Sequence, residues 1–442
     1  MKTRLAARLF SGPDGSLRRK GKGKQILTQA STTGSIPAQD QSGTRVSAIA
    51  MYCVLLLAYA LMAGDRFLFP FLGPDIRRDL GFSVADTGLL STIFTLGLGI
   101  GGLPTGFLLS RFSRKLVLQT GIIIFSAGTA LTVVMTGFWS MLICLALTGI
   151  GMAMMATVMF ALAASYFVGH RGAAVGSVNF CYGIGGFLAP NLARMLLGTY
   201  KSWHAPMIAF GLFGFLLVGV IALTVRSWFS ETRGVTAARK DLGGAPSLLN
   251  RNTVILTFLS IIHGLILYGF LGMYPTFLRE GLHYAPKNAA FVYSFFGMGA
   301  LLSIAGGFLG DRFSPKVVLG GAFLGTAVLG YLFFHGPSSV AVQATLTCAY
   351  GAVASATLYV NLAGYHVKAL RANLASRGSG MFVTTLYGSS AVAGYLMGGI
   401  VSHAGGIASL AAWMMAGNIQ IVLFSIFGAI LATALRPDQM SR

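Results

Sequence analysis

Two adjacent residues of opposite charge, Asp65 and Arg66, lie within a long apolar stretch of this 442-residue chain. An ionisable residue in such a stretch is costly, so it indicates a functional site. Tyr52, Tyr59 and Arg66 are spaced seven apart, which places them along one helix face. Guanidinium binds a carboxylate through two parallel hydrogen bonds. The spacing therefore predicts that Arg66, with Tyr59, binds an organic anion. The alternative is an Asp–Arg pair near a membrane interface that extends toward water.

A histidine, His263, lies near the middle of another apolar stretch, with Ser260 and Tyr274 on the same face. The reference pKa of histidine is about 6.5, which suits a group that takes up and releases protons. His263 and Tyr274 are therefore candidates for the substrate site, and His263 also for proton coupling. The alternative is a structural histidine that donates a hydrogen bond.

Polar residues form stripes at helical spacing in three further stretches. In one stretch, successive polar residues are separated by 4, 3, 7 and 4 positions, which puts them on one face that should point to a helix-bundle interior. The members of the three stripes are Gln343, Thr347, Tyr350, Thr357 and Asn361; Asn179 and Tyr182; and Thr384, Tyr387 and Ser390. We expect Tyr350, Asn361, Asn179, Tyr182 and Tyr387 to converge on one substrate cavity. The alternative for each stripe is hydrogen bonding between helices.

Composition defines the elements that must position these residues. The chain is 55% hydrophobic and 10% charged, with a mean hydropathy of +0.74, whereas soluble domains carry about 25% charged residues. Apolar runs of about 20 residues match the length of a membrane-crossing helix, and continuous runs favour helices over a barrel. The sequence predicts twelve spans: 46–70, 86–110, 115–136, 139–168, 173–199, 205–226, 252–278, 288–310, 316–336, 338–366, 378–403 and 406–435.

The formal net charge of +21 does not indicate nucleic-acid binding, because the basic residues follow the membrane topology. If residue 1 is inside, the inner segments hold 25 of the 32 Lys and Arg residues. This bias predicts that both termini are cytoplasmic. Arg194 then lies near an outer helix end, where it is expected to extend toward the interface. The chain is expected in the lipid bilayer of a plasma membrane or bacterial inner membrane.

One phrase occurs twice, as GFLLSRFSRK at 106–115 and GFLGDRFSPK at 307–316. The offset is close to half of the chain, which predicts two similar halves of six helices, 46–226 and 252–436. The polar segment 227–251 would be a cytoplasmic linker, and 437–442 a short tail. Residues 1–45 are expected to be a disordered basic tail that contacts anionic lipid. A transit peptide, or translation starting nearer Met51, are the alternatives for this segment.

The doubled phrase resembles the loop signature of the major facilitator superfamily, G-x-L-x-D-R-x-G-x-K/R. The resemblance implies an all-α membrane protein with twelve helices in two six-helix bundles around a central cavity, which works by alternating access. It also implies a cytoplasmic conformational latch made by Gly106, Arg111, Arg114, Gly307, Asp311 and Arg312. The two glycines would allow close packing of helix ends. The first copy has Ser110 where the family has an acidic residue, so Asp311 is expected to carry more of the latch.

The Asp65–Arg66 pair, followed by LGFSVADTGLLSTIF, resembles the organic-anion branch of that superfamily, the anion:cation symporters. The resemblance implies that Arg66 binds the substrate carboxylate and that Asp65 carries the coupling proton. The fourth span lacks the arginine and glutamate of that branch, so coupling through a fourth-helix carboxylate is excluded.

Two other functions stay open. Residues 176–190, GSVNFCYGIGGFLAP, resemble the fifth-helix motif of exporters, which would indicate a proton-coupled drug or sugar exporter; close helix packing is the alternative. A membrane sensor with a transporter fold would bind ligand without net flux. The sequence contains no phosphate-binding loop, catalytic motif or metal-ligand spacing. We therefore expect no enzyme activity, cofactor or metal, and a monomer that binds a small molecule and protons.

Overall fold

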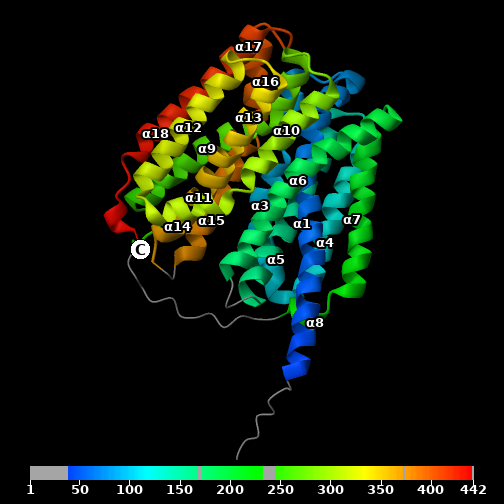
Figure 1. Cartoon of the computed structure of the whole chain (residues 1–442), viewed down its shortest axis with the longest axis vertical. Helices are drawn as coiled ribbons and strands as arrows, with labels where there is room; N and C mark the ends of the chain where they lie inside the picture. Colours follow the sequence, from blue (N-terminus) through cyan, green and yellow to red (C-terminus); the bar gives the residue numbers. More distant parts are fainter. Residues whose placement is uncertain (1–37, 167–170, 232–243, 372–373, 441–442) are drawn as a thin grey trace, which may run out of the picture. The chain divides into compact units, whose positions relative to one another are not determined.

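A computed structural model describes residues 38–166, 171–231, 244–371 and 374–440. Contacts divide the chain into two compact units, Met1–Val46 and Ser47–Arg442. The second unit is built from helices (Figure 1). Most of the expected tail, 1–37, and the Ser110 side chain lie outside the described part. Because Ser47–Arg442 is one unit, the division at 227–251 stays a prediction.

The helices of 46–226, the first half, match the predicted spans except that the first helix is longer and the second span is divided in two. They are α1 (Ala38–Leu80), α2 (Val84–Thr92), α3 (Phe94–Arg111), α4 (Arg114–Leu131) with a 3-10 turn Thr132–Val134, α5 (Phe138–Tyr166), α6 (Arg171–Tyr200) and α7 (His204–Thr224). The four-residue helix α8 (Ser227–Ser230) follows and is the helical part described within the expected linker.

The helices of 252–436, the second half, are more often interrupted. They are α9 (Arg251–Thr276) with the π-helix η3 (Phe277–Gly281), α10 (Pro286–Ala300), α11 (Ser303–Arg312), α12 (Pro315–His335), α13 (Val340–Tyr350) with the π-helix η4 (Gly351–Tyr359) and α14 (Val360–Lys368), α15 (Ala375–Ser390), α16 (Ala393–His403), α17 (Leu410–Ala416) with the π-helix η6 (Gly417–Leu423), and α18 (Phe424–Ala432). A 3-10 turn, Pro437–Gln439, ends the described chain.

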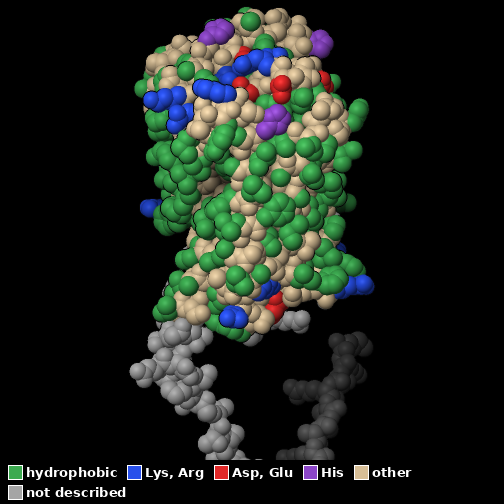
Figure 2. Space-filling view, turned by 90° about the vertical axis from the view of Figure 1, so that its right-hand side faces the viewer, with side chains coloured by type: hydrophobic (Ala, Val, Ile, Leu, Met, Phe, Trp, Pro, Cys, Tyr) green, Lys and Arg blue, Asp and Glu red, His purple; other side chains and the backbone are tan. Residues whose placement is uncertain are grey.

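Nine helices of the described residues are long and apolar enough to cross a membrane, and there are ten when the bent pair α10–α11 is counted as one span. The predicted spans 173–199 and 378–403 are also helical, as α6 and α15–α16. The count of twelve membrane crossings stays a prediction. On the face shown in Figure 2, charged side chains gather near the two ends and hydrophobic side chains cover the region between them. That distribution fits a protein surrounded by lipid.

The first helix is longer than predicted. The sequence prediction begins it at residue 46 and ends it at residue 70, but α1 runs from Ala38 to Leu80 and contains Pro70 and Pro74. Proline normally interrupts a helix because it lacks an N–H donor. Membrane helices tolerate it where neighbouring helices surround the interruption. Phe69 and Phe71 are 4% and 0% exposed, so this part of α1 is packed on all sides.

The doubled phrase forms the same turn twice. Phe112 (φ −118°, ψ 159°) and Phe313 (φ −111°, ψ 160°) end α3 and α11. Ser113 (φ −65°, ψ 145°) and Ser314 (φ −66°, ψ 145°) begin α4 and α12. These matching dihedral angles support the prediction of an internal repeat. The end of the helical unit that carries both turns is called the motif end below.

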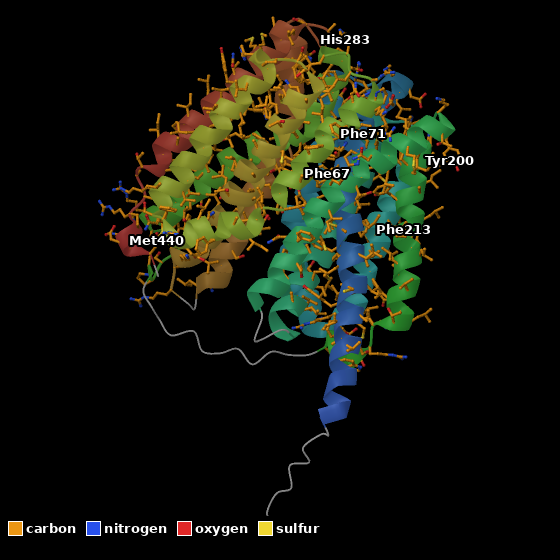
Figure 3. The ribbon with its side chains drawn as sticks, in the orientation of Figure 1. Phe67, Phe71, Tyr200, Phe213, His283 and Met440 are labelled. Atoms are coloured by element: carbon orange, nitrogen blue, oxygen red, sulfur yellow. The ribbon has the colours of Figure 1, made fainter. Side chains whose placement is uncertain are left out.

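The two halves meet closely at the opposite end. A Cβ atom on Gly88 of α2 would lie 2.1 Å from the carbonyl oxygen of Gly394 in α16, and Thr92 donates a hydrogen bond to the Ala391 carbonyl at 2.9 Å. Phe67 of α1 packs on Tyr293 of α10, with ring centroids 5.6 Å apart, whereas Phe213 of α7 lies on the outside (Figure 3). Because both residues are glycines, the backbones of α2 and α16 touch directly. No passage for a substrate remains between these two helices.

Candidate functional site

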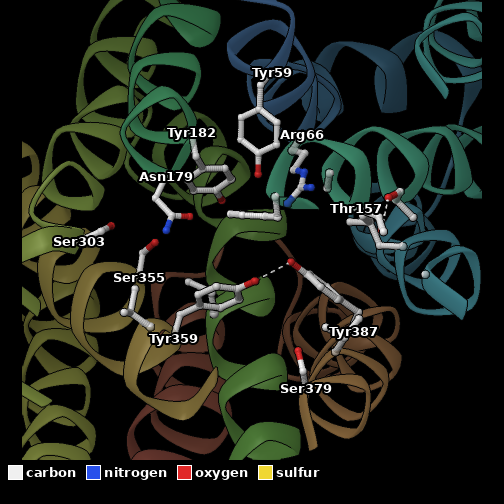
Figure 4. A pocket seen from close by; sticks show the side chains of 18 of the residues that line it. Tyr59, Arg66, Thr157, Asn179, Tyr182, Ser303, Ser355, Tyr359, Ser379 and Tyr387 are labelled. Carbon is white, nitrogen blue, oxygen red and sulfur yellow. Dashed lines mark hydrogen bonds between the residues drawn. The ribbon is translucent and has the colours of Figure 1, made fainter. Parts of the chain in front are cut away.

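A cavity of about 300 Å³ lies between the two halves (Figure 4). The lining side chains come from the middle of the spans and from the parts nearer the motif end. Its polar and aromatic side chains from the first half are Tyr59, Arg66, Thr157, Phe160, Asn179 and Tyr182. Those from the second half are Tyr268, Ser303, Ser355, Tyr359, Ser379 and Tyr387. We call this space the central cavity.

Arg66 is the one basic residue among the described residues that line the central cavity. Its side chain is buried, with 9% of the residue exposed. Its guanidinium carbon lies 5.7 Å from the centre of the Tyr182 ring, and its Nη2 contacts the Met62 sulfur at 3.5 Å. Its Nε has no hydrogen-bond partner among the described groups. Buried donors that lack a partner are costly, so this cation is suited to an anionic ligand.

Asp65 faces away from the central cavity. The Thr129 hydroxyl of α4 lies 2.9 and 2.8 Å from its two carboxylate oxygens. Adjacent helix residues are turned about 100° from one another, so Asp65 and Arg66 point to different neighbours. A void of about 10 Å³ adjoins both residues and is also lined by Thr148 and Met207. This volume is about that of one water molecule, so the carboxylate lies beside space for water.

The structure brings five of the nine predicted substrate residues together in the central cavity. They are Tyr59, Arg66, Asn179, Tyr182 and Tyr387. Tyr59 shares a helix face with Arg66, as the spacing predicted. Tyr52 does not line this cavity and lies 3.2 Å from the Ser177 hydroxyl instead.

Tyr274 and Tyr350 lie elsewhere, in the interior of the second half. The Tyr274 hydroxyl donates to Gln343 at 2.6 Å, and Thr347 donates to the Tyr274 hydroxyl at 3.2 Å. Both tyrosines are fully buried, and both pack on Phe270 with ring centroids 4.3 Å apart. The expectation that they reach the cavity is not met. The polar stripe that contains Gln343, Thr347 and Tyr350 does face the interior of the second half. Its hydrogen bonds join helices there, as the alternative interpretation proposed.

His263 and Asn361 also lie outside the central cavity. His263 is 0% exposed, its two ring nitrogens have no partner among described groups, and its ring meets Phe323 edge-on at 6.5 Å. Asn361 donates to the carbonyls of Gly306 and Thr357, both at 2.8 Å. Asn361 therefore joins α14 to α11 in the second half, and His263 packs within that half.

Tyr359 and Ser355 of the same span reach the cavity instead, and sequence analysis missed them. The reason is the π-helix η4. Its hydrogen bonds run from residue i to i−5, as the Thr357 hydroxyl bond to the Ala352 carbonyl at 2.9 Å also does. Each π turn adds a residue to the helix, so a stripe counted at 3.6 residues per turn changes face after Gly351. Tyr268 was also missed, although it is a polar aromatic residue in the middle of a span.

A cluster of five charged residues joins the halves at the end opposite the motif end. Asp75, Arg77 and Arg78 come from the end of α1, and Arg279 and Glu280 come from η3. We call the five residues the ion-pair cluster, and that end of the helical unit the ion-pair end.

Three of the four contacts in the ion-pair cluster cross between the halves. Arg279 binds Asp75 with both Nη atoms, one of them at 2.9 Å, and Arg77 binds Glu280 at 2.6 Å. Arg78 is more distant, at 3.8 Å from both Asp75 and Glu280. The Arg279 and Glu280 side chains are 6% and 12% exposed. The predicted spans 46–70 and 252–278 leave these residues outside the membrane, and the sequence analysis predicted no pairing among them. The sequence did contain an indication of this cluster, because charged residues of both signs follow the first predicted span of each half.

The residues of the predicted latch do not form such a cluster. Asp311 pairs with Lys368 at 2.7 Å, within the second half, rather than with the neighbouring Arg312, which is exposed. Arg111 stacks on Phe107 at 4.5 Å. The backbone N–H groups of Arg114 and Lys115 donate to Glu231 at 3.1 and 3.2 Å.

The two glycines of the predicted latch are not sites of close packing, contrary to expectation. A Cβ on Gly106 would meet nothing within 4 Å, and one on Gly307 would make an ordinary 3.7 Å contact. The neighbouring Gly306 is the close one, since its Cβ would lie 2.0 Å from the Ala356 carbonyl oxygen. Gly306 is turned about 100° from Gly307 on α11 and so faces η4.

Comparison with known proteins agrees with this fold. Residues 55–395 match the family model described as Major Facilitator Superfamily. The 4-hydroxybenzoate transporter PcaK of Pseudomonas putida is 24% identical over 326 residues, 65% of this chain and 71% of PcaK. The hexuronate transporter of Bacillus subtilis is 24% identical over 62% of this chain and 70% of its own. A solved inward-facing, occupied bacterial homolog of the human lysosomal transporter Spinster superposes with a TM-score of 0.69 at 16% identity, covering 91% of this chain and 97% of that one.

The chain therefore belongs to the Major Facilitator Superfamily. It is a multi-pass integral membrane transport protein for a small molecule, and not an enzyme. Its curated relatives include organic-acid transporters. The resemblance of the doubled phrase to the superfamily is confirmed. The curated relatives agree with the resemblance of the Asp65–Arg66 pair to its organic-anion branch.

Proposed function

We propose that this protein is a secondary active transporter that carries a small organic anion, bound through its carboxylate by Arg66. One observation carries the proposal. A single buried guanidinium, with a donor left without a partner, lies in a cavity between the two halves. Hydrogen bonds to charged groups are worth about 1.5–3 kcal/mol, enough to select anions over neutral analogues.

The rest of the cavity favours a substrate with a flat, apolar body. Aromatic rings from both halves line it, including Phe160, Tyr182 and Tyr268. Its volume is at the small end of ligand pockets, about 300 to 1,000 Å³. PcaK carries an aromatic acid by its name, and the hexuronate transporter a sugar acid. Both of these acids carry one carboxylate. The aromatic lining favours the aromatic acid over the sugar acid.

Uptake of radiolabelled benzoate and of a hexuronate into liposomes tests the proposal. Arg66→Ala should lower kcat/KM for carboxylates at least tenfold, and Arg66→Lys should recover part of the loss, because lysine keeps the charge without the planar fork. Arg194→Ala is the matched control, since Arg194 is another arginine within a span that does not line the cavity. Unchanged carboxylate uptake by Arg66→Ala would refute the proposal.

Asp65 is the residue we assign to proton coupling, in preference to His263. Asp65 adjoins a void the size of one water and is next to the substrate arginine. His263 lines neither that void nor the central cavity. Asp65→Asn should abolish uptake driven by a pH gradient while substrate exchange across the membrane continues. If His263→Gln uncouples transport and Asp65→Asn does not, the assignment is wrong.

Transport would proceed by alternating access of the central cavity to the two ends. The cavity lining lies toward the motif end, which we assign to the cytoplasm, together with both termini, from the distribution of basic residues. Exposure to the outside then requires the ion-pair cluster to separate. In the conformation in which the ion-pair end is open, the predicted latch residues would hold the motif end closed. One chain encloses the cavity, so we propose a monomer.

The alternatives give other results in the same liposomes. A sensor would bind substrate without flux. An exporter would favour drugs or sugars over carboxylates and would tolerate Arg66→Ala.

The exporter-like segment 176–190 packs closely at its glycines. A Cβ on Gly183 would lie 2.8 Å from the Gly297 carbonyl oxygen. That contact supports the packing interpretation of this segment.

A further inference from the structure

Two tyrosine hydroxyl groups form a polar pair in the second half's wall of the central cavity. The hydroxyl oxygens of Tyr359 in η4 and Tyr387 in α15 lie 3.0 Å apart. Figure 4 shows this pair on one side of the cavity and the Arg66 guanidinium with the Tyr59 hydroxyl on the other. The two sides of the cavity therefore differ in chemistry, with a cation on the first half and a neutral pair on the second.

Packing holds both tyrosine rings in place. The Tyr359 ring meets Phe382 edge-on, with centroids 5.3 Å apart. The Tyr387 ring meets Tyr268 edge-on at 6.1 Å, and Tyr387 is 7% exposed. Gly99 of α3 lies beside Tyr387, since a Cβ added to this glycine would be 3.5 Å from the Tyr387 Cβ. These contacts fix the hydroxyl positions before a ligand arrives, which is the condition for selective recognition.

A pair of hydroxyl groups has a defined binding capacity. One hydroxyl donates to the other, and Tyr268 also hydrogen-bonds with Tyr387. Three hydroxyls that share two hydrogen bonds keep one O–H donor and several acceptor lone pairs for a ligand. It can donate to and accept from a third hydroxyl placed between or beside the two oxygens. It carries no charge, so it offers little to a second carboxylate. The cavity residues that the structure describes provide a cation on the first-half side alone.

The geometry points to Tyr359 and Tyr387 as the residues that select a hydroxyl group on the substrate, at the end away from its carboxylate. This assignment rests on the proposed function, because it takes Arg66 as the carboxylate site. The substrate class is then an aromatic monocarboxylate with a distal hydroxyl. The substrate contacts both halves at once, Arg66 in the first and the tyrosine pair in the second.

The expected selectivity is moderate, for a physical reason. Sites whose polar groups are left unpaired by the wrong ligand reject it by about 10⁴-fold or more. Here one of the two hydroxyls already donates to the other when the ligand lacks a hydroxyl. The gain from the substrate hydroxyl is then that of an ordinary neutral hydrogen bond, about fivefold to tenfold in affinity.

Uptake of a series of benzoates into proteoliposomes tests the assignment. The wild-type protein should have a kcat/KM for 4-hydroxybenzoate about fivefold to tenfold above that for benzoate, with 2-hydroxybenzoate close to benzoate. Tyr359→Phe and Tyr387→Phe should each bring the ratio of 4-hydroxybenzoate to benzoate below about twofold, because the loss falls mainly on 4-hydroxybenzoate. A melting temperature close to that of the wild type shows that the variants fold.

Tyr395→Phe is the matched control. Tyr395 belongs to the same predicted span as Tyr387 but is 50% exposed and does not line the cavity, so this variant should keep the wild-type ratio. An unchanged ratio in both cavity variants, an equal loss for both substrates, or no wild-type preference would overturn the assignment. Preferential uptake of a hexuronate would overturn the aromatic class.

The two proposals can fail separately. Arg66-dependent uptake of benzoate and 4-hydroxybenzoate at equal rates would refute the hydroxyl assignment and leave the proposed function intact. Uptake that ignores Arg66→Ala would refute the proposed function, and the hydroxyl assignment with it.

Discussion

The two ends of the helical unit are held by different interactions. Of the five ion pairs found between described residues, the four at the ion-pair end belong to the cluster of α1 with η3, and three of them cross between the halves. The fifth, Asp311–Lys368 at the motif end, joins α11 to α14 within one half, and the Asp311 side chain is 73% exposed. The ion-pair end also has the backbone contact of Gly88 with Gly394.

This difference shows which end of the helical unit resists separation of the two halves. A partly buried ion pair that loses one partner leaves an uncompensated charge, at a cost of about 3 kcal/mol or more. An exposed pair contributes roughly 0–1 kcal/mol. Separation of the ion-pair end must therefore break several specific contacts, whereas the Asp311–Lys368 pair is unaffected by movement of one half against the other.

The largest expected effect comes from reversing a charge in the ion-pair cluster. Arg279→Glu places a third acidic side chain beside Asp75 and Glu280, so the ion-pair end should open, with a population shift on the order of a hundredfold. Spin labels at Tyr200 and Lys287, exposed positions of opposite halves near this end, report the opening as a longer distance.

Transport by Arg279→Glu should fall at least tenfold, because the closed state is lost. The double variant Arg279→Glu with Asp75→Arg restores an opposite-charge pair and should recover the shorter label distance. An unchanged distance distribution in the single variant would show that these pairs do not hold the end closed.

The next largest effect is expected from the glycine contact. Gly88→Ala would place a methyl group 2.1 Å from the Gly394 carbonyl oxygen, and such overpacking costs about 1–3 kcal/mol. The label distance should again increase. Gly399→Ala is the control in α16, because a Cβ there would meet nothing within 4 Å. Equal behaviour of the two variants would contradict the proposed closure by backbone contact.

The motif end offers a test of packing that does not depend on opening. Gly306→Ala would bring a methyl group 2.0 Å from the Ala356 carbonyl oxygen, within the second half. The melting temperature in detergent should fall, for a loss of about 1–3 kcal/mol, with the label distance unchanged. Gly307→Ala, whose contact is at 3.7 Å, should be neutral. A greater loss for Gly307→Ala would show that the motif glycine packs closely after all.

The smallest effect is expected at the exposed pair. Lys368→Ala should lower the free energy of unfolding by less than about 1 kcal/mol and leave the label distance at the ion-pair end as in the wild type. Because salt screens exposed charges, the difference from wild type should shrink in high salt. If Lys368→Ala lowered the free energy of unfolding as much as Arg279→Glu does, the distinction between the two ends would be removed.

Particular residues show how far sequence reasoning reached. The doubled phrase predicted two matching turns, because identical short-range patterns of Phe, Ser and basic residues adopt the same local dihedral angles. The seven-residue spacing of Tyr59 and Arg66 predicted a shared face, since α1 is a regular helix there. Tyr350 and Asn361 were misplaced, because the π-helix η4 between them changes the helical phase. Nothing in the spacing of polar residues indicates a π-helix.

The sequence by itself determined the helical membrane fold, the repeated turn and the buried Asp65–Arg66 pair, because apolar run length, repetition and intramembrane charge are local properties. The tertiary structure alone decided that Asp65 faces Thr129 and that Tyr359 faces the cavity. It also decided which end is held by ion pairs. These features depend on contacts between residues such as Asp75 and Arg279, about two hundred positions apart. Their pairing follows from how the two halves pack and not from any pattern within one helix.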